Sequence, residues 1–277
     1  DPLLGSIPPR DLAANTIEAR RKLRRKAPLW YGCTGLVYPS SLCAEQCSSE
    51  AAALYKASVV RRNVPEGGLV ADLTGGLGID SHFFSKTVWG VLYNEIDEAL
   101  VVAARHNFAL LGDDNIIVRQ GKVETGGIQR LLGTFSPDLI FLDPARRSSL
   151  GKKVFLMEDC SPDILSILVE LFALCRKVLV KLSPMADISM VKKRLEAASG
   201  VIGNCISEIH VVSLGGECKE LLVLLDRDCS GREPVLYCVE DGNILSFPSG
   251  DLSCAVAVFP HSPGRILFEP GASLRKT

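Results

Sequence analysis

The stretch Leu69–Asp80 reads LVADLTGGLGID, and it is the most informative part of the sequence about the fold. A short apolar run ends in Asp72, passes through a glycine-rich turn and opens into a segment with the apolar spacing of a helix. This order of strand, turn and helix predicts the first crossover of a doubly wound α/β sheet. Gly76 and Gly78 leave bare backbone against which a ligand can lie. The turn therefore predicts a ligand site at the carboxyl end of the first strand.

Strands and helices continue to alternate after this turn. We expect strands at 88–93, 116–119, 139–142 and 177–182, and helices at 98–111, 162–175 and 188–198. Two later strands, 206–212 and 221–226, are separated only by residues 213–220, which are too few for a crossover helix, so we expect them to pair antiparallel. The predicted fold class is α/β: a Rossmann-like, mostly parallel seven-stranded sheet that ends in an antiparallel hairpin.

Three regions are expected along the chain. A main domain at 65–228 follows a basic, helical N-terminal extension at 1–64 and precedes a small β-rich region at 229–277. A helix with Ser48 or Ser49 as its N-cap ends the extension at about Arg62, beside the ligand edge of such a fold. The chain begins with Asp1 and stops soon after Glu269-Pro270, so we expect a trimmed product whose C-terminal domain is incomplete.

The composition excludes several classes of protein. Of the 277 residues 47% are hydrophobic, enough for a large core, and the net charge is −1, so any nucleic-acid partner must meet a local basic patch. No apolar run approaches the ~20 residues of a membrane span, and the N-terminus lacks a signal-peptide pattern. Ten cysteines without a C-x-x-C pair are typical of small buried side chains in a reducing cytoplasm. Cys33, Cys43 and Cys47 could ligate a metal, but their spacing is not typical of a zinc site, and we predict none.

The densest basic run is Arg20–Lys26, which reads RRKLRRK at the end of a predicted amphipathic helix, 11–26. Such a run is either a solvated helix face or a contact for the phosphates of RNA or DNA. Six cations without an acid are more than solubility requires. Arg24 and Arg25 are therefore candidate nucleic-acid contacts.

Glu95 ends the second predicted strand, one βα unit after the glycine turn. A carboxylate there can accept both hydroxyls of a ribose, because its two oxygens have matching spacing. The alternative is an ordinary solvated acid at a strand end. Asp97 is the second choice for the same role.

These features resemble class I S-adenosylmethionine-dependent methyltransferases. Asp72–Gly78 is similar to their motif I, whose turn holds the methionine part of the cofactor, and a terminal antiparallel hairpin is typical of their sheet. The resemblance implies that S-adenosyl-L-methionine is the cofactor. It implies cofactor contacts by Asp72, Thr74, Gly76, Gly78, Glu95 and Val123.

The fourth predicted strand ends in Asp143-Pro144-Ala145-Arg146-Arg147, which resembles motif IV of amino-group methyltransferases, (D/N)-P-P-(Y/F). In that motif the acid and a carbonyl at the proline accept the N–H groups of an exocyclic amine and hold it in line with the methyl group. The resemblance thus implies that Asp143 and Pro144 are catalytic. The alternative is a plain Asp-Pro turn after a parallel strand.

Two positions depart from the pattern. Ala145 and Arg146 replace the second proline and the aromatic residue, although Arg146 and Arg147 could stack on a base or bind a phosphate. Lys122 occupies the place where these enzymes often have an acid for the adenine, which leaves Val123 or Glu124 for that contact.

The nearest family by resemblance is that of bacterial RNA methyltransferases with a DPAR motif and a THUMP-like C-terminal domain. Trimethylguanosine-synthase-type RNA cap methyltransferases are a more distant likeness. The resemblance implies a cytoplasmic enzyme that methylates an exocyclic amino nitrogen in RNA, rRNA or tRNA. Two alternatives are a non-catalytic RNA-binding module that keeps the fold and a nicotinamide-dependent oxidoreductase.

Overall fold

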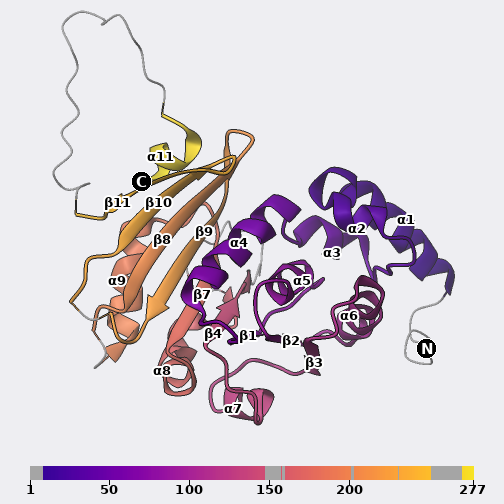
Figure 1. Ribbon diagram of the computed structural model, residues 1–277, viewed down its shortest axis with the longest axis horizontal. Coiled ribbons are helices and arrows are strands. Elements are labelled where there is room, and N and C mark those ends of the chain that lie inside the picture. The colour runs from indigo at the N-terminus through magenta and orange to yellow at the C-terminus, as the bar shows by residue number, and fades with distance from the viewer. Residues whose placement is uncertain (1–8, 147–156, 158–159, 201–202, 230, 251–269) are drawn as a thin grey trace, which may run out of the picture. The chain divides into compact units, whose positions relative to one another are not determined.

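The computed structural model describes residues 9–146, 157, 160–200, 203–229, 231–250 and 270–277 (Figure 1). The chain divides into two compact units. The first consists of residues 1–143 and 170–176, and the second of residues 144–169 and 177–277.

The first unit is built on parallel strands. They are β1 (Leu69–Asp72), β2 (Gly90–Glu95), β3 (Ile116–Gln120) and β4 (Leu139–Leu142), in the order β4-β1-β2-β3. Asp72 lies level with both Tyr93 and Phe141, so the carboxyl ends of β1, β2 and β4 meet at one edge. Strands β1, β2 and β4 are almost entirely buried, as is typical of a parallel sheet covered on both faces.

Helices cover both faces of this sheet. In Figure 1, α4 (Glu50–Asn63), α5 (Ile79–Ser85) and α6 (Glu98–Leu111) lie on one side of the strands and α7 (Ile128–Leu132) lies on the other. The Ser49 side chain caps α4 by accepting the Ala52 N–H, as the sequence predicts. The linker 64–68 then leads into β1.

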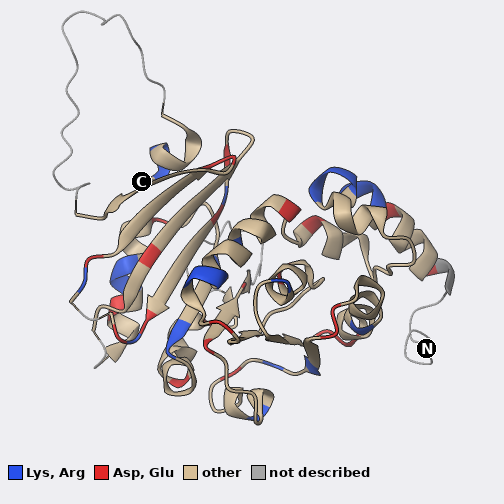
Figure 2. Ribbon diagram, viewed as in Figure 1, with Lys and Arg blue, Asp and Glu red and all other residues tan. Residues whose placement is uncertain are grey.

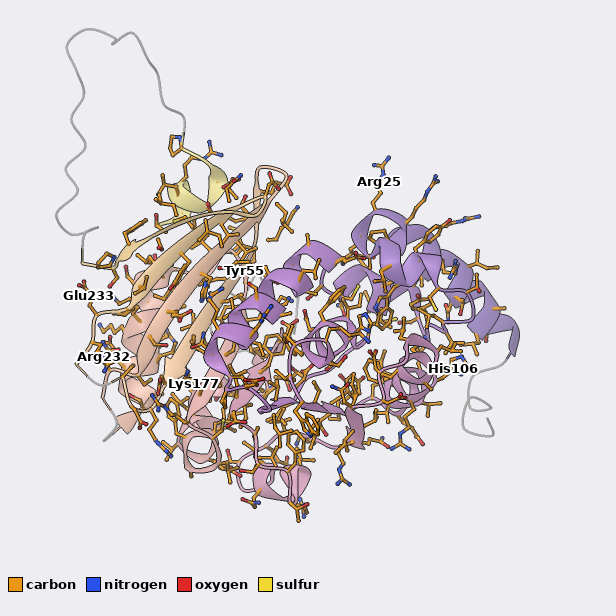
Figure 3. The ribbon with its side chains drawn as sticks, in the orientation of Figure 1. Arg25, Tyr55, His106, Lys177, Arg232 and Glu233 are labelled. Carbon is orange, nitrogen blue, oxygen red and sulfur yellow. The ribbon has the colours of Figure 1, made fainter. Side chains whose placement is uncertain are left out.

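The N-terminal segment forms three helices: α1 (Pro9–Lys26), α2 (Pro28–Gly32) and α3 (Ser41–Gln46). The buried amide of Asn107 on α6 anchors this segment, because it accepts the N–H of Val37 and donates to its carbonyl, both at 2.9 Å. His106 lies 2.9 Å from the Gly35 carbonyl and adds a second anchor on the same helix (labelled in Figure 3).

The second unit contains a mixed sheet. Its strands are β7 (Lys177–Leu182), β8 (Ile206–Leu214), β9 (Glu217–Asp226), β10 (Val235–Glu240) and β11 (Asn243–Pro248), in the order β7-β9-β8-β10-β11. As predicted, β8 and β9 form an antiparallel hairpin, closed by Gly215 and Gly216, and β10 then adds parallel to β8. The unit also holds a short pair, β5 (Ala145–Arg146) with β6 (Cys160–Ser161), and the helices α9 (Ile188–Ala198) and α11 (Ala272–Lys276). Helix α8 (Ile164–Leu174) is shared by both units.

The structure confirms the predicted α/β class with its parallel strands and terminal hairpin. Strands β10 and β11 of the predicted β-rich region continue the sheet from β8. Within the predicted helical extension, residues 28–46 contain α2 and α3, and Pro28 begins a helix as well as ending one. Residues 251–269 of the predicted β-rich region lie outside the described residues. Within the described part of the chain, no helix has the length and apolarity to cross a membrane.

Candidate active site

Backbone hydrogen bonds fix the glycine turn between β1 and α5, one to strand β2 and one within the turn. The N–H of Gly75 donates to the Asn94 carbonyl at 2.8 Å, and the N–H of Gly78 donates to the Gly75 carbonyl at 2.9 Å. A Cβ at Gly75 would lie 2.1 Å from the Tyr93 ring, and one at Gly78 would lie 2.6 Å from Phe108. These two positions therefore require glycine, because the rings of Tyr93 and Phe108 pack directly against their backbone.

Gly76 differs from both. Its φ of +53° is left-handed, and a Cβ there would meet nothing within 4 Å. The Tyr93 hydroxyl donates to its carbonyl at 2.5 Å, so the strand below fixes the peptide. Gly76 is thus the position of the turn where a ligand can approach bare backbone.

Glu95 is tied to this turn from the end of β2. One carboxylate oxygen accepts the Gly76 N–H at 2.8 Å, and the other accepts the N–H groups of Ile96 and Asp97 at 2.7 and 3.0 Å. Each oxygen has two acceptor sites, so the oxygen on Gly76 can still accept a ribose hydroxyl. Asp97, the second choice, instead caps α6 by accepting the N–H groups of Ala99 and Leu100, which favours Glu95 for the ligand.

Asp72 lies beneath the turn and is only 1% exposed. Its carboxyl group accepts the Ser81 hydroxyl at 2.6 Å and the Thr74 N–H at 3.2 Å. Burial raises the pKa of Asp72 to about 8, and the nearby carboxylates of Asp80 and Asp143 add to the rise, whereas these two hydrogen bonds oppose it. Asp72 therefore supports the turn from below. Its predicted contact with the cofactor stays a prediction.

The raised pKa of Asp72 predicts that the free energy of unfolding depends on pH, and that Asp72→Asn removes this dependence. An unfolded Asp has a pKa of about 3.9, so the folded chain holds this proton up to about pH 8 while the unfolded chain loses it. This contribution to the free energy of unfolding is complete below about pH 4 and is lost as the pH rises to about 8, by up to about 1.4 kcal/mol per pH unit. Urea unfolding of both proteins at about pH 5 and about pH 8 measures it. If the unfolding free energies of the unaltered protein and Asp72→Asn changed equally with pH, the raised pKa of Asp72 would be contradicted.

Asn94, which was not among the predicted site residues, also belongs to this edge of the sheet. Its buried side-chain amide donates to the carbonyls of Leu73 and Gly121, both at 3.0 Å. Those carbonyls follow β1 and β3, so one side chain on β2 links three neighbouring strand ends. The signal was present in the sequence, since a polar residue inside an apolar strand that is buried on both faces needs partners.

Asp143 reaches the turn from the end of β4. Its backbone N–H donates to the Thr74 hydroxyl at 2.6 Å, which links the fourth strand to the glycine turn. Pro144, with which the second unit begins, is buried. Arg146 belongs to β5, but its side chain, like the whole of Arg147, lies outside the described residues.

Apolar side chains flank the acids at this edge. Ile96, which directly follows Glu95, is 59% exposed, and Val123 is half-buried after the end of β3. On either side of Val123, exposed Lys122 and Glu124 pair at 2.6 Å. Glu124 is therefore paired with Lys122. A flat ring bound at this part of the edge would contact the apolar side chains of Ile96 and Val123.

The basic run of α1 separates into two groups. Arg20 donates to the carbonyls of Tyr31 and Cys33 and lies over the Tyr31 ring, Lys22 pairs with Glu45 at 2.8 Å, and Lys26 donates to carbonyls on α3. These three cations hold the helices of the segment together. The others, Arg21, Arg24 and Arg25, are exposed along the end of α1. Figure 2 shows this end of α1 in blue, and in Figure 3 the side chain of Arg25 points away from the ribbon.

The structure thus brings most of the predicted site residues to one edge of the first unit. Hydrogen bonds join the segment 72–76 to Glu95 on one side and to Asp143 on the other. Gly78 packs below the turn, and Val123 lies two residues beyond Gly121, which the Asn94 side chain links to the end of β1. Arg24 and Arg25 lie on a separate element, α1.

Comparison with known proteins gives likenesses among solved structures. No protein-family model matches the chain, and no curated protein matches it. Among solved structures, it is similar to a "putative methyltransferase" from Porphyromonas gingivalis W83, with a TM-score of 0.81 and 32% identity, over 98% of this chain and 65% of that one. It is also similar to a human methyltransferase 10 domain containing protein, with a TM-score of 0.56 and 14% identity, over 77% of this chain and 98% of that one.

The chain spans 65% of the length of the Porphyromonas protein. The second likeness, at 14% identity, bears on the fold alone. The chain has the fold of class I S-adenosylmethionine-dependent methyltransferases.

Proposed function

We propose that this chain is an S-adenosylmethionine-dependent methyltransferase that methylates an exocyclic amino nitrogen of a base in RNA. The observation that carries the proposal is the arrangement of the glycine turn. Gly76 leaves its backbone open, Glu95 is bound to it on one side, and the strand end with Asp143 is bound to the turn on the other. A nucleoside-binding acid and an amine-orienting acid therefore flank one ligand position.

The residues of this edge fit the cofactor. Glu95 would accept the ribose hydroxyls, and Ile96 and Val123 would pack against the adenine ring. The backbone at Gly76 would lie against the amino-acid part, while Asp72, Thr74 and Gly78 keep the turn in place. When bound, the cofactor supplies a methyl group on a positively charged sulfur.

The acceptor needs orientation more than a base. The lone pair of an exocyclic amine is delocalised into its ring, which makes the nitrogen a poor nucleophile. The Asp143 carboxylate and the carbonyl at Pro144 would each accept one N–H and hold the nitrogen pyramidal and in line. The nitrogen loses its proton only after it has gained the methyl group and a positive charge, so no strong base is required.

Exposed cations support RNA as the substrate. Arg21, Arg24 and Arg25 have no role in holding α1 to α2 and α3, and together they present a basic surface suited to phosphates. Arg146 and Arg147 would add cations beside the amine-orienting acid. We propose rRNA or tRNA in the cytoplasm as the substrate class.

The triple variant Arg21→Gln/Arg24→Gln/Arg25→Gln should weaken RNA binding and make it less dependent on salt. Each phosphate contact releases condensed counterions, so the slope of log K against log salt concentration should become shallower by about 2 to 3. Arg105→Gln/Arg119→Gln/Arg130→Gln removes three equally exposed cations from α6, β3 and α7 and serves as the matched control. Filter binding to rRNA fragments over a range of salt concentrations measures both. If the slope of log K against log salt concentration were equal in the two variants, a role of α1 in RNA binding would be contradicted.

Methyl transfer itself tests the proposed function. The purified chain is incubated with S-adenosylmethionine carrying a labelled methyl group and with unmethylated rRNA or tRNA, and the RNA is digested to nucleosides. We expect label on an amino nitrogen of a base. Label on a ring nitrogen, a carbon or a ribose would contradict the proposed role of Asp143. RNA binding without any transfer would favour the non-catalytic module.

A further inference from the structure

Three buried polar side chains, those of Ser48, Lys56 and Asp80, contact one another next to the glycine turn. The Lys56 ammonium, on α4, lies 3.0 Å from one carboxylate oxygen of Asp80 and donates to the Ser48 hydroxyl at 2.7 Å. The Ser48 hydroxyl in turn donates to the other oxygen of Asp80 at 2.7 Å. Lys56 is fully buried, and the other two side chains are nearly so. The proposed reaction uses none of the three.

Packing alone does not explain a charge at position 56. The same helix buries Ala52, Ala53 and Val60, so Lys56 is a charged residue on an otherwise apolar buried face. Removing a lysine and an aspartate from water is costly, and apolar replacements of a buried ion pair are often equally stable or more stable. The network is therefore better explained by the position that it imposes on its members.

That position is the start of α5. Asp80 lies two residues after Gly78, and the next residue, Ser81, donates to the carboxyl group of Asp72 beneath the turn. Strand β2 holds the turn through Asn94 and Glu95, and the end of β4 holds it through Thr74. Lys56 on α4 and Ser48, which directly precedes the N-cap of that helix, hold Asp80 where the turn enters α5.

We propose that Ser48 and Lys56 are positioning residues of the cofactor site, which fix Asp80 and thereby the backbone of Gly76–Gly78 where the amino-acid part of the methyl donor binds. The inference rests on the proposed function, since it takes the turn as the site of that part. It makes α4 a component of the cofactor site, although the helix precedes the predicted main domain.

The proposed role predicts that changes in these residues affect some ligands of the site more than others. Glu95 ends β2, which the network does not touch, and its carboxylate meets the turn at the Gly76 N–H rather than at the start of α5. Loosening the start of α5 should therefore weaken ligands that carry the amino-acid part and spare ligands that consist of adenosine alone. S-adenosylhomocysteine and 5′-methylthioadenosine form such a pair, because the second lacks the amino acid.

The test compares the affinities of these two ligands by calorimetry. Ser48→Ala removes the bridging hydroxyl, and Lys56→Met/Asp80→Asn removes both charges of the ion pair. We expect S-adenosylhomocysteine to bind about threefold more weakly to the first variant and about tenfold more weakly to the second. Binding of 5′-methylthioadenosine should change by less than about twofold in both. The double variant should unfold at a temperature close to that of the unaltered protein.

Ser85→Ala is the matched control. Ser85 is as buried as Ser48, and its hydroxyl also lies against a carboxylate, that of Asp113, but at the far end of α5. This variant should bind both ligands normally. The proposal is overturned if the Ser48 and Lys56 variants weaken both ligands equally, as a general loss of structure would, or weaken neither. An unaltered protein that binds neither ligand would contradict the proposed function on which the inference rests.

Discussion

Asp143→Ala should lower the rate of methyl transfer by about 100-fold or more, because a preorganised polar contact to the reacting group contributes this much. Its backbone N–H, which holds Thr74 and the glycine turn, is retained in the variant, so the cofactor site should keep its shape. Affinity for S-adenosylhomocysteine should therefore change by less than about threefold. A loss of rate without a loss of cofactor affinity is the signature of a residue that orients the acceptor.

Single-turnover rates at saturating cofactor and RNA measure this effect separately from binding. Asp143→Asn keeps one acceptor oxygen in nearly the same place, so its rate should lie between those of Asp143→Ala and the unaltered protein. Near-normal turnover by Asp143→Ala would remove Asp143 from the catalytic machinery. It would also leave the Asp-Pro sequence as an ordinary turn after β4.

Gly76→Val should reduce the affinity for S-adenosylhomocysteine by about 100-fold or more, since a branched side chain would fill the position where the ligand meets bare backbone. The space beside Gly76 is open in the structure, so the fold can accommodate the side chain. The remaining cost is the left-handed backbone, which is of order 1–3 kcal/mol for a residue other than glycine.

Gly112→Val controls for that cost. Gly112 ends α6 with a φ of +67°, and a Cβ there would also meet nothing within 4 Å, but the residue lies outside the candidate site. Both variants should lose similar unfolding free energy in urea, while only Gly76→Val loses cofactor affinity by calorimetry. Equal affinities in the two variants would refute the role of the turn.

The fold could be predicted wherever one local pattern determined a structure. The run 69–80 predicted β1, the turn and the beginning of α5, and the short connection 213–220 required an antiparallel hairpin. The helices α2 and α3 were not predicted, because each spans too few residues for a periodic pattern. Strand β9 begins at Glu217, earlier than predicted, since the polar residues at its start pair with β8 on a partly exposed part of the hairpin.

The same distinction applies to the candidate site. Asp72, Glu95 and Asp143 could be selected because parallel strands bring their carboxyl ends together, and each acid ends or follows a strand. Lys56 and Ser48 could not, because their partner Asp80 lies on another helix and the contact arises only when α4 packs on α5. Nor does the sequence of α1 show that Arg20, Lys22 and Lys26 have partners within the N-terminal segment.

Calorimetric titration of the chain with S-adenosylhomocysteine, with NAD as the control ligand, measures whether this edge of the sheet binds the methyl donor. The geometry of the glycine turn and Glu95 predicts binding of S-adenosylhomocysteine with a dissociation constant of about 1–100 μM and no binding of NAD. Binding of NAD in preference to S-adenosylhomocysteine, or binding of neither, would contradict the claim that this edge of the sheet holds a methyl donor.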